Sequence, residues 1–110
     1  MSSYFELKSA AGAQFMFNLK AGNHEVVLTS ESYATKQGAT DGIDSVKANA
    51  PSDSQYERKT AADSSPYFVL KATNGQTIGR SQMYSSTSAM EAGIAAVKSG
   101  APTATVKDIT

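Results

Sequence analysis

The sequence predicts an α+β fold built from a tandem repeat of a β-β-β-α-β unit. Three observations support this prediction. The two halves of the chain align without a gap at an offset of 51 residues, each half contains runs that alternate between apolar and polar residues, and each half carries an apolar stripe with helical spacing. Two such stripes can cover only one face of a sheet. We therefore expect one mainly antiparallel sheet, two helices on one of its faces and an approximate twofold axis between the halves.

The length of the chain favours a single domain. A chain of 110 residues suffices for one domain, whereas half of it would bury too small a fraction of its surface to be stable alone. We therefore expect residues 1–110 to form one domain of two repeats, at about 4–53 and 54–110.

Strands are predicted where apolar and polar residues alternate. These runs are residues 4–8, 15–21 and 25–29 in the first repeat and 67–72, 76–81 and 104–109 in the second. Asn23 and Asn74 lie at the centres of the hairpin turns, where Asn and Gly tolerate a positive φ. Residues 54–59 align both with the end of one repeat and with the start of the next. This segment is therefore predicted to be a shared strand that joins the two halves into one sheet.

A helix is predicted after the third strand of each repeat, with Thr35 and Ser86 as the N-caps. In the second copy Ser88, with Glu91 at capping-box spacing, is an alternative start. The two apolar stripes are Ala39, Gly42, Ile43 and Val46 in the first copy, and Met90, Gly93, Ile94 and Val97 in the second. A glycine inside a helix costs about 1 kcal/mol relative to Ala, so the repeated glycine predicts a close approach of the helix to the sheet or to the other helix.

The predicted helix ends follow the same pattern in both copies. Asn49 and Gly100 are expected to close the helices in a left-handed conformation, and Pro51 and Pro102 prevent continuation.

Composition argues against several classes of protein. Ten basic and ten acidic side chains give a net charge of zero without any block of like charge, which disfavours a duplex nucleic-acid binder or a polybasic membrane-surface protein. Cysteine is absent, which excludes disulfides, thiolate metal sites and thiol nucleophiles. The first residues do not resemble a secretory signal, and no apolar run is long enough to span a bilayer, so a cytoplasmic protein is expected.

The residues that could carry catalysis have simpler structural interpretations. His24 is the sole histidine and falls in a predicted turn, where it can be a residue that tolerates the backbone angles. The run of hydroxyl residues at 85–88 suits helix capping, and Asp41 and Asp44 fall on an exposed helix flank. We therefore expect no catalytic, cofactor-binding or metal-binding residue, no cofactor and no enzymatic activity.

The predicted sheet face opposite the helices is the surface that stands out. Its alternation also displays Glu6, Met16 and Val69, and the residues predicted to form an interaction face are Tyr4, Lys8, Asn18, Lys20, Tyr67 and Lys71. Aromatic and basic side chains on an exposed sheet can stack bases and hold phosphates, so the expected partner is a protein or a single-stranded nucleic acid. An ordinary solvated face, or pairing with another copy, would also explain this surface.

Two other functions stay open. The paired glycines could frame a pocket between the two helices, as in a small-molecule-binding protein or an enzyme. The other is a structural or stress-protective role without a specific ligand.

The repeated motifs resemble the YegP-like family of small bacterial proteins. Four motifs carry this resemblance. In the second copy they are Phe-x-Leu-Lys-Ala-x-Asn-x-x-x-Ile at residues 68–78, Ser-x-x-Tyr at 81–84, Gly-Ile-x-x-Val-Lys at 93–98 and Ala-Pro at 101–102. The first copy matches them at 17–23, 30–33, 42–47 and 50–51. The copies differ where Leu28 aligns with Gly79 and Leu7 with Arg58. The resemblance implies a sheet with exchanged terminal strands, formed either by tandem repeats or by paired single-repeat subunits. It therefore implies a monomer that imitates such a dimer. The family is one of unknown function, so it implies no catalytic residues.

Overall fold

The computed structural model describes residues 3–110 as one seven-stranded sheet with two helices. The elements in chain order are β1 (Tyr4–Ala10), β2 (Gln14–Lys20), β3 (Val26–Ser30), α1 (Lys36–Asn49), η1 (Asp53–Gln55), β4 (Tyr56–Thr60), β5 (Pro66–Lys71), β6 (Thr77–Arg80), α2 (Thr87–Gly100), η2 (Ala101–Thr103) and β7 (Thr105–Asp108). The strand order is β4-β5-β6-β3-β2-β1-β7, and β1–β7 is the one parallel pair within the described residues. The predicted α+β tandem repeat is confirmed.

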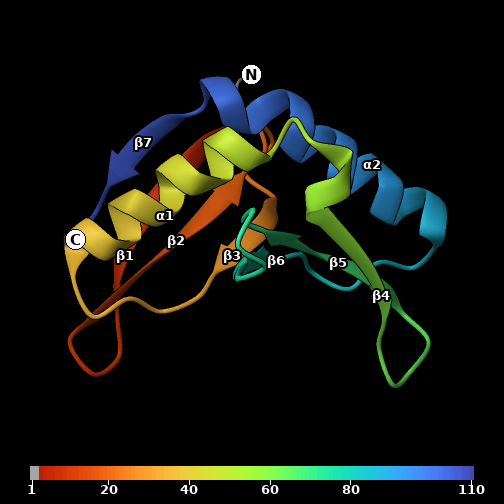
Figure 1. The fold of residues 1–110 in the computed structure, drawn as a ribbon, viewed down its shortest axis with the longest axis horizontal. Helices are drawn as coiled ribbons and strands as arrows, with labels where there is room; N and C mark the ends of the chain where they lie inside the picture. Colours follow the sequence, from red (N-terminus) through yellow and green to blue (C-terminus); the bar gives the residue numbers. More distant parts are fainter. Residues whose placement is uncertain (1–2) are drawn as a thin grey trace.

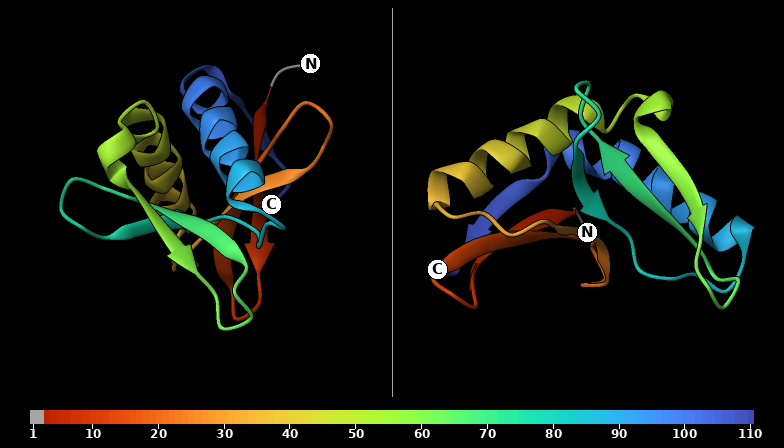
Figure 2. Two further views of the ribbon diagram at one scale, coloured as in Figure 1. Left: turned by 90° about the vertical axis from the view of Figure 1, so that its right-hand side faces the viewer. Right: turned by 60° about the horizontal axis from the view of Figure 1, so that its bottom comes forward.

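Both helices lie on the same side of the sheet, as predicted (Figures 1 and 2). The sheet is bent, with β1 and β2 in one wing and β4 and β5 in the other, and the face away from the helices lies on the inside of the bend (Figure 1). Between the helices and the sheet lies a core of apolar side chains from both repeats. Its largest fully buried members are Phe5, Phe17, Phe68, Leu19, Leu28, Ile43, Leu70, Ile94, Val46 and Val97.

The two halves meet at the antiparallel pair β3–β6, where Thr29 lies opposite Arg80 and Ser30 opposite Gly79. The prediction that a shared strand at 54–59 joins the two halves within the sheet is wrong. β4 lies at the outer edge of the sheet, and among the described residues it pairs with β5 alone. The chain instead crosses between halves after each helix. The segment after α1 continues into β4 beside β5, and the segment after α2 returns as β7 beside β1.

A single leucine fills the centre of the helix-facing side of the sheet. A β-bulge after Leu19 brings both Val27 and Leu28 into the core, with exposed fractions of 6% and 0%. Gly79 is the equivalent of Leu28 in the second repeat, and the Leu28 side chain lies directly over it. The Leu28 Cγ is 2.8 Å from the position that a Cβ on Gly79 would take. The difference between the copies at this position is therefore explained by sterics: only one of the two symmetry-related sites can carry a side chain.

The helix starts are confirmed and the predicted helix ends are wrong. The Thr35 Oγ1 accepts a hydrogen bond from the Gly38 N–H, and Ser86 caps α2 in the same way. At the other end, the C-caps Ala50 and Ala101 have φ of −55° and −62° and are right-handed, so no left-handed residue closes either helix. The proline that follows each C-cap lacks an N–H and ends the helix instead.

The glycine inside each helix makes room for a tyrosine ring. A Cβ at Gly42 would lie 2.5 Å from the Oη of Tyr33, and Gly93 has the same relation to Tyr84. Tyr33 is stacked on Phe17, with ring centroids 6.2 Å apart, and burial raises the pKa of both tyrosines. The predicted close approach is therefore real, but it involves the tyrosine of each Ser-x-x-Tyr motif rather than sheet backbone or the other helix.

Candidate functional site

We call the sheet face away from the helices the open face. By register and alternation it carries Tyr4, Glu6, Lys8, Met16, Asn18, Lys20, Thr29, Glu57, Lys59, Tyr67, Val69, Lys71 and Arg80. One row of side chains crosses all six antiparallel strands, in the order Glu6, Asn18, Thr29, Arg80, Val69 and Glu57. The approximate twofold axis passes between Thr29 and Arg80, so every member of the row has its repeat partner in the same row.

Each wing of the open face carries a carboxylate between two lysines. Glu6 lies 3.2 Å from the Nζ of Lys20 and 4.0 Å from that of Lys8. The second repeat has the same arrangement: Glu57 lies 2.7 Å from Lys59 and 3.0 Å from Lys71.

Each of these groups of three keeps one unbalanced positive charge. Hydrogen bonds from Lys59 and Lys71 hold the pKa of Glu57 below its ordinary value, so Glu57 stays ionised at neutral pH. With Arg80, the face has five cationic and two acidic side chains on a chain whose net charge is zero.

Arg80 is the cation at the centre of the open face. It is exposed, and within residues 3–110 no carboxylate oxygen lies within 4.0 Å of its guanidinium. It borders a depression of about 320 Å³ at the junction of β3 and β6, lined by Val26, Thr29, Ser30, Glu31, Arg80, Ser81 and Gln82. Arg80 is the cation of this lining and Glu31 its carboxylate. The Arg80 guanidinium, which has no ion-pair partner within residues 3–110, is the group suited to hold a phosphate or carboxylate.

Five of the six side chains predicted for the interaction face lie half-buried on the open face, namely Tyr4, Lys8, Lys20, Tyr67 and Lys71. Asn18 is a correction. It belongs to the open face by register, but only 4% of it is exposed, because it lies inside the bend and its Nδ2 donates to the Thr29 Oγ1 at 3.0 Å. Val69, its repeat partner, is 3% exposed for the same geometric reason.

Sequence reasoning missed Arg80, the most central charge of the face. The signal was present in two forms: Arg80 ends the alternating run of the second hairpin, and it aligns with Thr29 at the repeat offset. Its importance could not be seen without knowing that β3 and β6 pair at their ends and so bring these two positions together.

His24 occupies the turn predicted for it, with a φ of +70° that matches the +85° of Gly75 in the other repeat. The preceding Asn23 accepts a hydrogen bond from the Glu25 N–H through its side chain, which closes the turn. A ring nitrogen of His24 is 2.9 Å from the Tyr4 hydroxyl, so the histidine positions an open-face tyrosine. Among residues 3–110 no three His, Asp or Glu side chains come together as metal ligands would.

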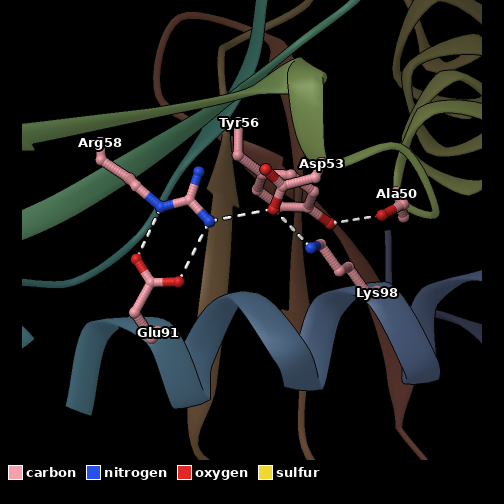
Figure 3. A network of polar contacts seen from close by, with 6 residues as sticks. All are labelled: Ala50, Asp53, Tyr56, Arg58, Glu91 and Lys98. Atoms are coloured by element: carbon pink, nitrogen blue, oxygen red, sulfur yellow. Dashed lines mark hydrogen bonds and ion pairs between the residues drawn. The ribbon is translucent and has the colours of Figure 1, made fainter. Parts of the chain in front are cut away.

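A second polar network lies on the helix side of β4 (Figure 3). Arg58 forms two hydrogen bonds with the Glu91 carboxylate of α2, at 2.6 and 3.0 Å, and a third with Asp53 at 3.0 Å. Asp53 also pairs with Lys98 of α2, and these two cations lower its pKa to about 2. The network attaches the edge strand to α2.

Tyr56 adds a buried hydrogen bond to this region, because its hydroxyl donates to the Ala50 carbonyl at 2.7 Å (Figure 3). Burial of that hydroxyl raises the pKa of Tyr56 far above its ordinary value. The first repeat has Phe5 and Leu7 in place of Tyr56 and Arg58, and these two are fully or almost fully buried. Arg58 is exposed and its interactions are ionic, so the position that is buried as Leu7 in the first repeat is not buried in the second.

The depression next to one of the paired glycines involves only one helix. A second depression, of about 390 Å³, runs along α2 and the β2–β3 hairpin, lined by Ala21, Glu25, Val27, Gln82, Tyr84, Ala89, Ala92, Gly93 and Ala96. None of these residues belongs to α1. Within the part of the chain that the structure describes, neither helix is long and apolar enough to cross a membrane.

Comparison with known proteins places this architecture in a family. A domain of unknown function, DUF1508, matches the chain twice, at residues 10–57 and 61–108. A UPF0339 protein of Bordetella pertussis is 63% identical over 110 residues, covering 100% of this chain and 98% of the relative. The UPF0339 protein YegP of Escherichia coli K12 is 50% identical over 110 residues, with both chains fully covered.

Solved structures agree with the fold. The solution NMR structure of a UPF0339 protein from Shewanella oneidensis superposes with a TM-score of 0.94 at 51% identity, covering 100% of this chain and 93% of the other. The solution NMR structure of YegP from E. coli superposes with a TM-score of 0.94 at 50% identity, covering 100% of this chain and 95% of the other. No specific function is assigned to these relatives. The chain thus belongs to the YegP-like UPF0339 family, as a tandem pair of DUF1508 repeats.

Proposed function

We propose that the protein is a non-enzymatic binding module that holds single-stranded nucleic acid on the open face. The observation that carries the proposal is the central Arg80. Within residues 3–110 it has no carboxylate partner, and it lies between two lysine-rich wings on the inside of a bent sheet. A flexible single strand can follow such a surface.

The charge distribution supports an anionic partner. The open face holds an excess of positive charge although the whole chain is neutral, so the surplus negative charge lies elsewhere. Cationic side chains on such a face attract phosphates and release their counterions, which favours binding at low salt. Tyr4 and Tyr67, one on each wing, provide rings on which bases can stack.

The lack of apolar anchors favours nucleic acid over a protein partner on this face. Protein interfaces are centred on a cluster of aromatic and aliphatic anchors, whereas the two tyrosines of the open face lie apart, one on each wing. Within residues 3–110 the exposed large apolar side chains are Met83, Val106 and Ile109, and none belongs to the open face. We place this activity in the cytoplasm, where single-stranded RNA is abundant.

The test is a titration of the ¹⁵N-labelled full chain with an eight-nucleotide single-stranded RNA of mixed sequence. Amide shifts are expected at Tyr4, Lys20, Tyr67, Lys71 and Arg80. Shifts confined to the helices, or no shifts at any concentration, would refute the proposal. An acidic octapeptide that binds the same face at least as tightly would assign the face to a protein partner and overturn the nucleic-acid assignment.

A matched pair of variants separates specific binding from general attraction. Arg80→Thr installs the residue of the other repeat at the centre of the open face, and Arg58→Leu does the same on the helix side of the sheet. Both remove one positive charge. We expect Arg80→Thr to weaken binding about tenfold, because one charged contact is worth roughly 1–2 kcal/mol, and Arg58→Leu to leave it nearly unchanged. Equal losses in the two variants would show that only net charge matters.

A further inference from the structure

We propose that the depression at the junction of β3 and β6 binds one guanine base of the single strand held on the open face. In this arrangement the Glu31 carboxylate accepts hydrogen bonds from the base, and the Arg80 guanidinium holds a neighbouring phosphate. The inference rests on the proposed function, because it concerns the same bound strand. It adds a residue that sets sequence preference to a face whose other cations contact phosphates.

The depression lies where the two repeats meet, and its lining is symmetric in position but not in charge. Apart from Val26, its lining residues are repeat equivalents, namely Thr29 with Arg80, Ser30 with Ser81 and Glu31 with Gln82. The cation comes from the second repeat and the carboxylate from the first, and each has an uncharged equivalent. The two charges therefore break the twofold symmetry, so a bound strand meets a different environment in each direction.

The hydroxyl groups of the lining are already used by the fold. The Ser30 Oγ accepts a hydrogen bond from the Phe17 N–H at 2.9 Å and donates one to the Glu31 backbone carbonyl at 2.7 Å. Ser81 makes the same two bonds in the second repeat. These serines shape the depression, and the two charged side chains are left to contact a ligand.

Glu31 is an exposed carboxylate beside a face that attracts phosphates. Within residues 3–110 no nitrogen of a basic side chain, that of Arg80 included, lies within 4.0 Å of its oxygens. An unpaired carboxylate repels a phosphate backbone, so it weakens binding there unless donor groups of the ligand reach it. A ligand that offers an anionic group to Arg80 and donors to Glu31 satisfies both side chains.

Guanine is the RNA base whose donors match a carboxylate. Its Watson–Crick edge presents two adjacent donors, N1–H and the N2 amino group, to the two oxygens of a carboxylate. Adenine and cytosine offer an amino group beside an acceptor, and uracil offers one N–H between two carbonyls. In a single strand this edge is free to be read by protein side chains. Val26 adds apolar surface to the lining, against which the face of a base can pack.

The test compares labelled RNA octamers that differ at one central nucleotide, with their binding to the full chain measured by fluorescence anisotropy. The octamers are octauridylate, the same strand with one guanosine, and the same strand with one inosine, which lacks the N2 amino group. The guanosine octamer should bind about fivefold more tightly than the inosine octamer, because the latter loses one hydrogen bond to a charged acceptor. In the ¹⁵N-labelled chain, the guanosine octamer should add amide shifts at residues 29–31 and 80–82.

Three variants separate base reading from charge. Glu31→Gln should bind octauridylate at least as tightly as the wild type, because a repelling charge is removed, but it should lose the preference for guanosine. Glu25→Gln is the matched control, since it removes an exposed carboxylate that does not line this depression, and it should keep the preference. Arg80→Thr should weaken binding of all octamers by the same factor and keep the preference, because it removes a phosphate contact.

The outcomes distinguish this inference from the proposed function. Equal affinities for the three octamers would overturn the guanine site and leave strand binding on the open face in place. No binding of any octamer would overturn both. A guanosine preference that survives in Glu31→Gln would overturn the role of the carboxylate. Guanosine 5′-monophosphate that binds the depression as tightly as the guanosine octamer would assign the site to a free nucleotide and overturn its assignment to a strand.

Discussion

Exchanging the side chains of Leu28 and Gly79 should leave a protein that is far more stable than the two single variants predict. Leu28 is fully buried, and a Cβ at Gly79 would lie 2.8 Å from its Cγ and 3.1 Å from the Thr29 carbonyl oxygen. Leu28→Gly should cost about 3–5 kcal/mol through the cavity and the added backbone freedom. Gly79→Leu should cost about 1–3 kcal/mol or more by overpacking.

The double variant moves one leucine to the symmetry-equivalent site, where it can fill the space that Leu28 leaves. Most neighbouring core positions are alike in the two repeats, for example Ile43 with Ile94, but Ala39 corresponds to Met90, so the recovery should be incomplete. We expect the double variant to be more stable than the sum of the single changes by at least about 2 kcal/mol, within the range seen for residues in direct contact.

Urea unfolding of all four proteins, followed by circular dichroism, measures this coupling energy directly. The four slopes against urea must agree for the comparison to hold, because a changed slope would indicate a different unfolded or native state. Additive free energies within about 0.5 kcal/mol would refute the reasoning, since they would mean that the two sites do not share one space across the twofold axis.

Three further predictions concern stability. Gly93→Leu should lower the free energy of unfolding by about 1–3 kcal/mol, since its side chain would collide with the Tyr84 hydroxyl, and Tyr84→Ala in the same chain should restore part of the loss in a thermal melt. Tyr56→Phe should cost about 1–2 kcal/mol in urea unfolding, because it leaves the buried Ala50 carbonyl without its donor. The pKa of Asp53 is about 2 in the fold against an ordinary value of 3.8, so its contribution to stability is present above about pH 4 and is lost as the pH falls towards 2. Asp53→Asn should therefore flatten the acid limb of a stability–pH curve, and an unchanged limb would contradict that assignment.

Local signals and the repeat predicted the fold class and most of its elements. Alternation identified the strands, and Thr35 and Ser86 marked the helix starts correctly, because these features depend on neighbouring residues. The comparison of the two copies within one chain also predicted that both helices lie on one face of the sheet. The position of β4 could not be predicted, because a segment that aligns with both ends of a repeat fits either a central or an edge strand.

The candidate site was predictable only in part. Alternation assigned Tyr4, Lys20 and Lys71 to the correct face, but it contains no information on curvature, which buries Asn18. The role of Arg80 depends on pairing between segments about fifty residues apart in sequence, which no local pattern encodes.

The salt dependence of RNA binding by the wild type and by Arg80→Thr tests the central claim most directly. If the Arg80 guanidinium neutralises a phosphate at the centre of the open face, the slope of log K against log salt should fall in magnitude by about one in the variant. An identical slope and affinity in the two proteins would contradict the claim that this face is the binding site.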